Sequence, residues 1–114
     1  MYGALMARLS TDFWVAAYLA RLEMAAIPAF LVAKGDATSG AVLIKVATMN
    51  GRASAFHRAL GPDFERIWAP LAEDVEEAEA DAALARQREF DADVWIIEIE
   101  DKHGRTLLEE EGLS

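Results

Sequence analysis

The chain contains no cysteine and few histidines or prolines, with two and three of them among 114 residues. Without cysteine it can form no disulfide, no zinc–thiolate site and no cysteine nucleophile. That composition suits a reducing compartment, and we expect a cytoplasmic protein. We also expect no cofactor, because the glycine-flanked loop at residues 35–40 precedes a predicted strand. A phosphate-cradling loop would instead open a helix.

Positive charge is also scarce, since 11 basic residues face 20 acidic ones and the net charge is −9. The basic residues are scattered, and the acidic ones concentrate in residues 73–111. A nucleic acid or an anionic membrane surface would be repelled, so we expect neither as a partner. Hydrophobic residues make up 54% of the chain, enough for a core. We expect a single domain over residues 1–114, with frayed ends at 1–7 and 110–114.

One long apolar run covers residues 13–33. Arg21, Glu23 and Pro28 interrupt it, which argues against a membrane span and favours a helix followed by a strand. Ser10, Thr11 and Asp12 have the residue types that cap a helix and complement its dipole, so we predict a helix over residues 13–26. This helix is apolar on nearly every side, so its own domain or a partner chain must cover it.

Alternating and turn-forming residues predict the rest of the fold. The predicted strands are Ala29–Lys34, Ala41–Thr48, Arg52 to about Arg58, Val94–Glu100 and a short Arg105–Glu109, with Asn50-Gly51 as a hairpin turn. Phe64, Ile67, Trp68 and Leu71 recur at helical spacing and predict a helical turn, and Asp74–Glu77 has the spacing of a cap for an alanine-rich helix reaching Arg88. The pattern is typical of an α+β fold, a small antiparallel or mixed sheet of four to five strands with two main helices on one face.

The strand predicted at Val94–Glu100 carries the candidate site. Alternation turns Glu98 and Glu100 away from the core, with their Cα atoms about 7 Å apart. The two carboxylates could share a divalent metal with Asp91, Asp93 or Asp101, and Arg21 could reach them across the sheet. The candidate catalytic residues are therefore Glu98, Glu100, Asp91 and Arg21, and the candidate metal ligands are Glu98, Glu100 and Asp101. The alternative is a solvated strand face, with Arg21 in a structural ion pair.

Several segments together resemble a known family. These segments are Arg8-Leu9-Ser10-Thr11-Asp12-Phe13-Trp14-Val15, Lys34-Gly35-Asp36 with Gly40-Ala41-Val42, Phe90 to Asp101, and Gly104-Arg105. They resemble a family of small bacterial proteins known only as domain of unknown function 1491. The resemblance implies a stand-alone cytoplasmic protein of one domain, and it brings no substrate, cofactor or catalytic residue.

Our leading functional hypothesis is a non-enzymatic protein-interaction module. It would pair through helix 13–26 with a second copy or with another protein, burying part of Trp14, Tyr18 and Leu22. One alternative is a divalent-metal-dependent enzyme that uses the strand carboxylates. A second alternative is an acidic regulatory protein that mimics nucleic acid through residues 73–101.

Overall fold

The computed structural model describes residues 10–110. Its elements are α2 (Thr11–Met24), β1 (Ala29–Ala33), β2 (Val42–Ala47), β3 (Arg52–Leu60), β4 (Arg66–Glu76), α3 (Glu77–Phe90) and β5 (Trp95–Glu100). The fraying expected at residues 1–7 and 110–114 lies, apart from Glu110, outside the described part of the chain. Between residues 10 and 110, no helix is long and apolar enough to cross a membrane.

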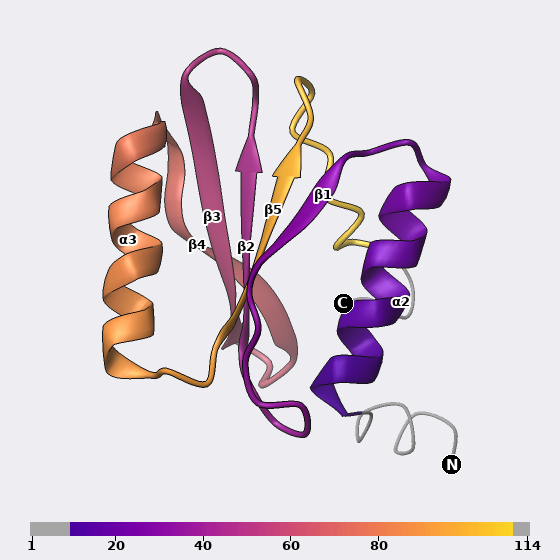
Figure 1. Ribbon diagram of the computed structural model, residues 1–114. Coiled ribbons are helices and arrows are strands. Elements are labelled where there is room, and N and C mark those ends of the chain that lie inside the picture. Colours follow the sequence, from indigo (N-terminus) through magenta and orange to yellow (C-terminus); the bar gives the residue numbers. More distant parts are fainter. Residues whose placement is uncertain (1–9, 111–114) are drawn as a thin grey trace.

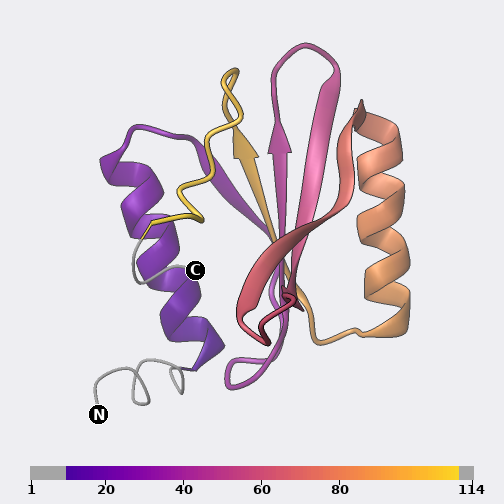
Figure 2. The ribbon, with the colours of Figure 1, turned by 180° about the vertical axis from the view of Figure 1, so that it is seen from behind.

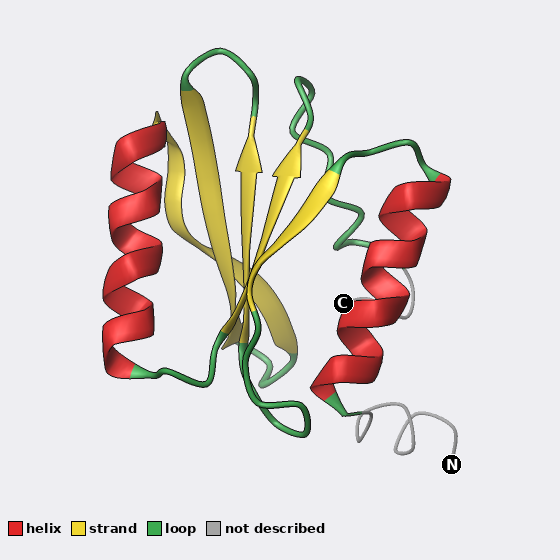
Figure 3. Cartoon of the chain, viewed as in Figure 1, coloured by secondary structure: helices red, strands yellow, loops and turns green. Residues whose placement is uncertain are grey.

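The strands form one five-stranded sheet in the order β1-β5-β2-β3-β4 (Figure 3). β1 pairs with β5, β2 with β3 and β3 with β4 in antiparallel fashion, whereas β2 and β5 run parallel. The parallel pair arises because β3, β4 and α3 all intervene, which supplies the long crossover that parallel neighbours need. The α+β fold with two main helices and a mixed, mostly antiparallel sheet is confirmed.

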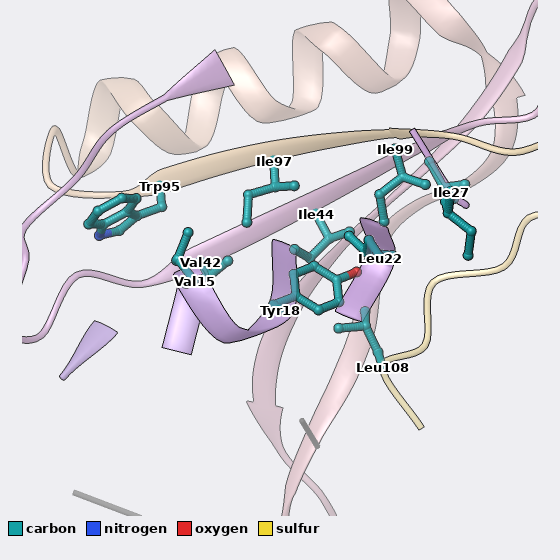
Figure 4. Close-up of a cluster of buried hydrophobic side chains, with 11 residues drawn as sticks. Val15, Tyr18, Leu22, Ile27, Val42, Ile44, Trp95, Ile97, Ile99 and Leu108 are labelled. Atoms are coloured by element: carbon teal, nitrogen blue, oxygen red, sulfur yellow. The ribbon is translucent and has the colours of Figure 1, made fainter. Parts of the chain in front are cut away.

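The two helices cover opposite faces of this sheet, so the expectation that both lie on one face was wrong (Figures 1 and 2). On the α2 face, Tyr18 and Leu22 pack with Ile44 of β2 and with Ile97 and Ile99 of β5 (Figure 4). On the α3 face, Leu84 packs with Leu43 and Ile96. Every residue of β2 is buried, and a strand that is buried on both faces is typical of a sheet covered on both sides.

Most of the predicted helical turn around residues 64–71 is instead part of β4, an edge strand of 11 residues that begins at Arg66, and Phe64 lies in the turn before it. The pairing of β3 with β4 shifts register on both sides of Ala55. Trp68 lies on the α2 side and Leu71 on the α3 side, as strand alternation places residues three apart, so their spacing does not mark one face of a helix. Pro70 is compatible with a strand here because β4 lies at the edge of the sheet.

The predicted cap of the second helix also differs. α3 begins at Glu77, and its N-cap residue Glu76 makes no side-chain capping hydrogen bond. Asp74 faces β3 instead, where its Oδ1 accepts from Nε of Arg52 at 2.7 Å. Asp74, which the sequence pattern assigned to the cap of α3, therefore belongs to β4 and pairs with Arg52 of β3.

The short strand predicted at Arg105–Glu109 is absent, and this segment is an irregular chain packed on α2. The hydroxyl of Tyr18 donates to the carbonyl oxygen of Thr106 at 2.8 Å, and Leu108 is buried in the same cluster. Burial raises the pKa of Tyr18, so its phenol stays protonated and keeps donating. This segment thus closes one side of the core without joining the sheet.

Candidate functional site

The densest group of charges in the described residues surrounds Lys45, whose side chain is only 4% exposed. Its Nζ lies 2.8 Å from Oε1 of Glu77, 2.7 Å from Oδ1 of Asp81 and 3.0 Å from Oε1 of Glu98. Glu98 is its register neighbour on the parallel strand β5. Glu77 and Asp81 stand one helical turn apart in α3, so both reach the same ammonium. We call these residues the Lys45 cluster.

The Lys45 cluster holds its lysine in the charged form. Burial by itself would lower the pKa of Lys45, but the hydrogen bonds to Asp81, Glu77 and Glu98 outweigh it and raise that pKa. A lysine that stays protonated has no lone pair for nucleophilic or general-base chemistry. The ion pairs therefore join α3 to the sheet. Because three carboxylates surround one ammonium, the cluster has an excess of negative charge.

The structure brings only one of the predicted site residues, Glu98, into this cluster. Glu100 lies on the same face two residues further along β5, partly exposed. Asp91 precedes the opposite end of β5, where its Oδ1 accepts from the backbone N–H of Asp93 at 2.9 Å. Arg21 belongs to α2, which covers the other face of the sheet. Within residues 10–110, no three His, Cys, Asp or Glu side chains are arranged to hold a metal ion.

Asp101, the third candidate metal ligand, forms an ion pair with Arg105. Its Oδ2 accepts from the backbone N–H of Arg105 at 2.7 Å, and its Oδ1 accepts from Nη2 of Arg105 at 2.8 Å. These contacts lower the pKa of Asp101 to about 2. The chain turns back between the two residues at Gly104, whose φ of +70° favours glycine. Asp101 thus fixes the turn that leads the C-terminal segment back to α2.

This contact predicts a pH-dependent effect of Asp101→Asn. Because the folded-state pKa is about 2 and the ordinary value is 3.8, the carboxylate stabilises the fold above about pH 4 and loses this effect as the pH falls towards 2. We expect the substitution to lower the free energy of unfolding at pH 7 by about 1.5–3 kcal/mol, the range for hydrogen bonds to charged groups. Urea denaturation across this pH range should show the difference shrinking towards pH 2.

Asp91→Asn is the matched control, because Asp91 is exposed and its carboxylate has a single hydrogen bond, to the backbone of Asp93. It should change stability much less. A loss for Asp101→Asn that is equally large at pH 2 and pH 7 would contradict the assigned role.

Segments on which the family resemblance rests meet at one end of the sheet. The backbone N–H of Asp36 donates to the carbonyl oxygen of Asp93 at 2.9 Å, and Nε1 of Trp95 donates to the carbonyl oxygen of Asp36 at 2.8 Å. Gly35 and Gly40 both pack against the Asp93 carbonyl, and a Cβ at either position would lie within 2.4 Å of its oxygen. We call this contact the Gly35–Asp93 junction.

The junction also receives the start of α2. The backbone N–H groups of Thr11 and Asp12 donate to the carbonyls of Thr38 and Ala37, at 3.1 and 2.9 Å. These donors are already engaged, so the helix end offers them to no anionic ligand. The carboxylate of Asp36, its pKa lowered by the hydrogen bonds that it accepts within the loop, fixes the loop itself. The residue pattern of this region thus has a structural explanation.

Sequence reasoning also missed a cation packed against two tryptophans, whose ring centroids are 5.8 Å apart. The guanidinium carbon of Arg58 lies 4.7 Å from the ring centroid of Trp68 and 5.7 Å from that of Trp14. Burial, together with the nearby charge of Arg66, lowers the pKa of Arg58 to about 10. The tryptophans are 54 positions apart (68 − 14), so no local motif indicated the contact. It joins α2 to the β3–β4 hairpin by cation–π attraction.

The edge of the sheet at β1 has an unusual surface. Phe30, Leu31 and Val32 are 50%, 45% and 57% exposed, and no charged residue lies within Ala29–Ala33. Among residues 10–110, β5 is the one strand that pairs with β1. Tyr18 and Leu22, in contrast, are completely buried in the core. β1 therefore has exposed apolar side chains, whereas Tyr18 and Leu22, two of the residues that the sequence hypothesis assigned to a partner, lie in the core.

These contacts define a class of protein, a small α+β domain with a mixed sheet between two helices and a buried lysine surrounded by carboxylates. Residues 9–109 match the family described as "Protein of unknown function (DUF1491)", and the chain belongs to that family. The resemblance inferred from the sequence is thereby confirmed. A search among curated proteins finds no match.

Solved structures of relatives agree with the fold. A crystal structure of a DUF1491 family protein from Caulobacter crescentus CB15 has a TM-score of 0.81 and 43% identity, covering 90% of this chain and 96% of that one. An NMR structure of a DUF1491 family protein from the same organism gives 0.78 and 42%, covering 90% and 94%. Protein Atu0922 from A. tumefaciens gives 0.70 and 30%, covering 82% and 86%. None of these descriptions names an activity, so the function of the chain is unknown.

Proposed function

We propose that the protein is a non-enzymatic interaction module and that its docking element is the free edge of β1. An extended segment of a partner protein would add there as a sixth strand. The observation that carries the proposal is the exposure of Phe30, Leu31 and Val32 on a strand whose outer edge pairs with no strand of residues 10–110. In strand addition the main chain supplies hydrogen bonds and the alternate side chains supply specificity.

The two edges of the sheet differ in a way that supports this proposal. Proteins usually protect an edge strand with charges, proline or bulges, because an unprotected edge pairs with other chains. β4 has such protection, with Arg66, Pro70 and Glu73 along its length. β1 contains no charge and no proline. Its pairing with β5 has one irregularity, between Leu31 and Ala33 near the end of the strand. The contrast within one sheet favours β1 as a binding edge.

Association with a second copy or another protein through helix 13–26 is the alternative proposal. Since Tyr18 and Leu22 are buried in the core, such a dimer would have to use the outer face of α2, where Phe13 and Met24 are 60% and 87% exposed. We place the module in the bacterial cytoplasm, as the sequence composition and the bacterial relatives favour.

A neutral probe tests the edge. We expect a heptapeptide of alternating valine and serine to shift the amide NMR signals of Ala29–Ala33 and of β5, with a dissociation constant of about 1 mM or below. Val32→Lys should abolish these shifts, because a charge on the edge opposes pairing. Phe64→Lys is the matched control, since Phe64 is 84% exposed at the turn between β3 and β4 and should leave binding unchanged.

Two outcomes decide whether β1 is the docking edge and what binds to it. If no signal near β1 moves at millimolar peptide, the proposed edge is wrong. If the protein alone self-associates by light scattering, and Val32→Lys but not Phe64→Lys makes it monomeric, the edge is right and its occupant is a second copy of the chain.

A further inference from the structure

We infer that the segment received by β1 is basic, with lysine or arginine alternating with apolar side chains. This inference rests on the proposed function of β1 and adds the chemistry of the partner. It follows from the charges that lie beside β1 on the α3 face of the sheet.

The strand register places the charges. Phe30 of β1 is paired with Glu98 of β5, and Glu98 is paired with Lys45 of β2. These neighbours form a row across one face of the sheet, which begins with an exposed aromatic ring at the edge and leads into the Lys45 cluster. A strand added to β1 would extend this row by one position.

The row has an excess of negative charge. Three carboxylates surround the one ammonium of Lys45, and their side chains remain 45%, 56% and 28% exposed for Glu77, Asp81 and Glu98. Glu100 adds a fourth carboxylate on the same face. Partly solvated carboxylates of this kind can accept a further cation, whereas an acidic segment would be repelled.

The dimensions of a sheet permit the contact. An added strand would lie about 4.8 Å from β1 and so about 10 Å from β5. A long lysine or arginine side chain and a glutamate side chain can together span that distance. The basic side chain would pass over the exposed ring of Phe30, where a cation–π contact adds attraction. Apolar side chains at the alternate positions would pack beside Leu31 on the other face.

Lys34 limits where the basic residues can be. It follows β1 directly at the end of the strand where the Gly35–Asp93 junction begins, and it is exposed. A second cation at that end would be repelled. The basic side chains of the partner should therefore lie at the Phe30 end of β1, near Glu98 and Glu100.

Three matched heptapeptides test the inference, with valine alternating with lysine, serine or glutamate. At low ionic strength we expect the lysine peptide to bind β1 at least about tenfold more tightly than the serine peptide, and the glutamate peptide to bind more weakly than either. Raising the salt to about 1 M should remove the lysine advantage, because the screening length falls to about 3 Å. Amide NMR shifts of residues 29–33 report the binding.

Substitutions identify the carboxylates. Glu98→Gln with Glu100→Gln should reduce the affinity for the lysine peptide several-fold and leave that for the serine peptide unchanged. Glu89→Gln is the matched control, because Glu89 is exposed at the far end of α3 from Glu77. Thermal unfolding of each variant confirms that it is folded, since Lys45 retains Glu77 and Asp81 as partners.

The outcomes separate this inference from the proposed function. Equal binding of the lysine and serine peptides at β1 would overturn the basic partner and keep the docking edge. Lysine-peptide shifts that persist in Val32→Lys would also overturn the inference, because binding would then lie elsewhere on the acidic surface. Failure of both peptides to bind would overturn the edge itself.

Discussion

Replacing all three carboxylates of the Lys45 cluster by their amides, as Glu77→Gln with Asp81→Asn and Glu98→Gln, should lower the free energy of unfolding by about 3 kcal/mol. The reason is that the ammonium of Lys45, 4% exposed, would stay buried with no opposite charge beside it. Each single substitution should cost less than about 1 kcal/mol, because two carboxylates remain and all are partly solvated. The loss in the triple variant should therefore exceed the sum of the single losses.

Adding Lys45→Met to the triple variant is the decisive control. It removes the buried charge and keeps an apolar side chain of similar length, so it should recover much of the lost stability. Urea denaturation at pH 7 measures all the variants on one scale. If the triple variant unfolds like the sum of the single variants, or if Lys45→Met gives no recovery, the cluster does not anchor α3 to the sheet.

The second large effect is expected from Gly35→Ala at the Gly35–Asp93 junction. A Cβ at position 35 would lie 2.1 Å from the carbonyl oxygen of Asp93 and 2.7 Å from the carbonyl carbon of Val94. Both are backbone atoms, so the clash can be relieved only by moving apart the segments that the Asp36–Asp93 hydrogen bond joins. We expect a loss of about 3 kcal/mol in unfolding free energy, at the upper end for overpacking.

Gly61→Ala is the control for this substitution. Its Cβ would also meet an atom at 2.1 Å, but that atom belongs to the side chain of Glu65, which can rotate away. The cost there should be much smaller. Because Nε1 of Trp95 donates to Asp36, a change in tryptophan fluorescence of folded Gly35→Ala would report the displaced junction directly. Equal melting temperatures for the two variants would refute this account.

The period-two alternation along β5 was predictable because it depends on neighbouring residues alone. Ile97 and Ile99 are completely buried on the α2 face, and Glu98 points to the other face, as the sequence analysis expected. β4 was not predictable in the same way, because its register shifts break the alternation. A local rule works where the strand is regular and fails where a bulge changes which face a side chain occupies.

The candidate site was predicted only in part for a related reason. Glu98 was identified because the sequence shows Glu98 and Glu100 alternating with apolar residues on a predicted strand. Its partners were not, since Lys45 and Glu77 are 32 positions apart and a spacing of that size carries no signal. Arg21 was expected near Glu98, but α2 covers the opposite face. Because β2 is buried on both faces, its sequence does not indicate which helix covers which face of the sheet.

The sequence by itself determined the regular strands, the two helices, the acidic balance and the family to which the chain belongs, because composition and local periodicity are properties of neighbouring residues. Tertiary structure alone decided that the helices lie on opposite faces, that Lys45 gathers three carboxylates, and that within residues 10–110 β1 pairs on one side only. These features depend on contacts between distant segments. Their formation is governed by how the whole chain buries its apolar surface and neutralises its buried charge.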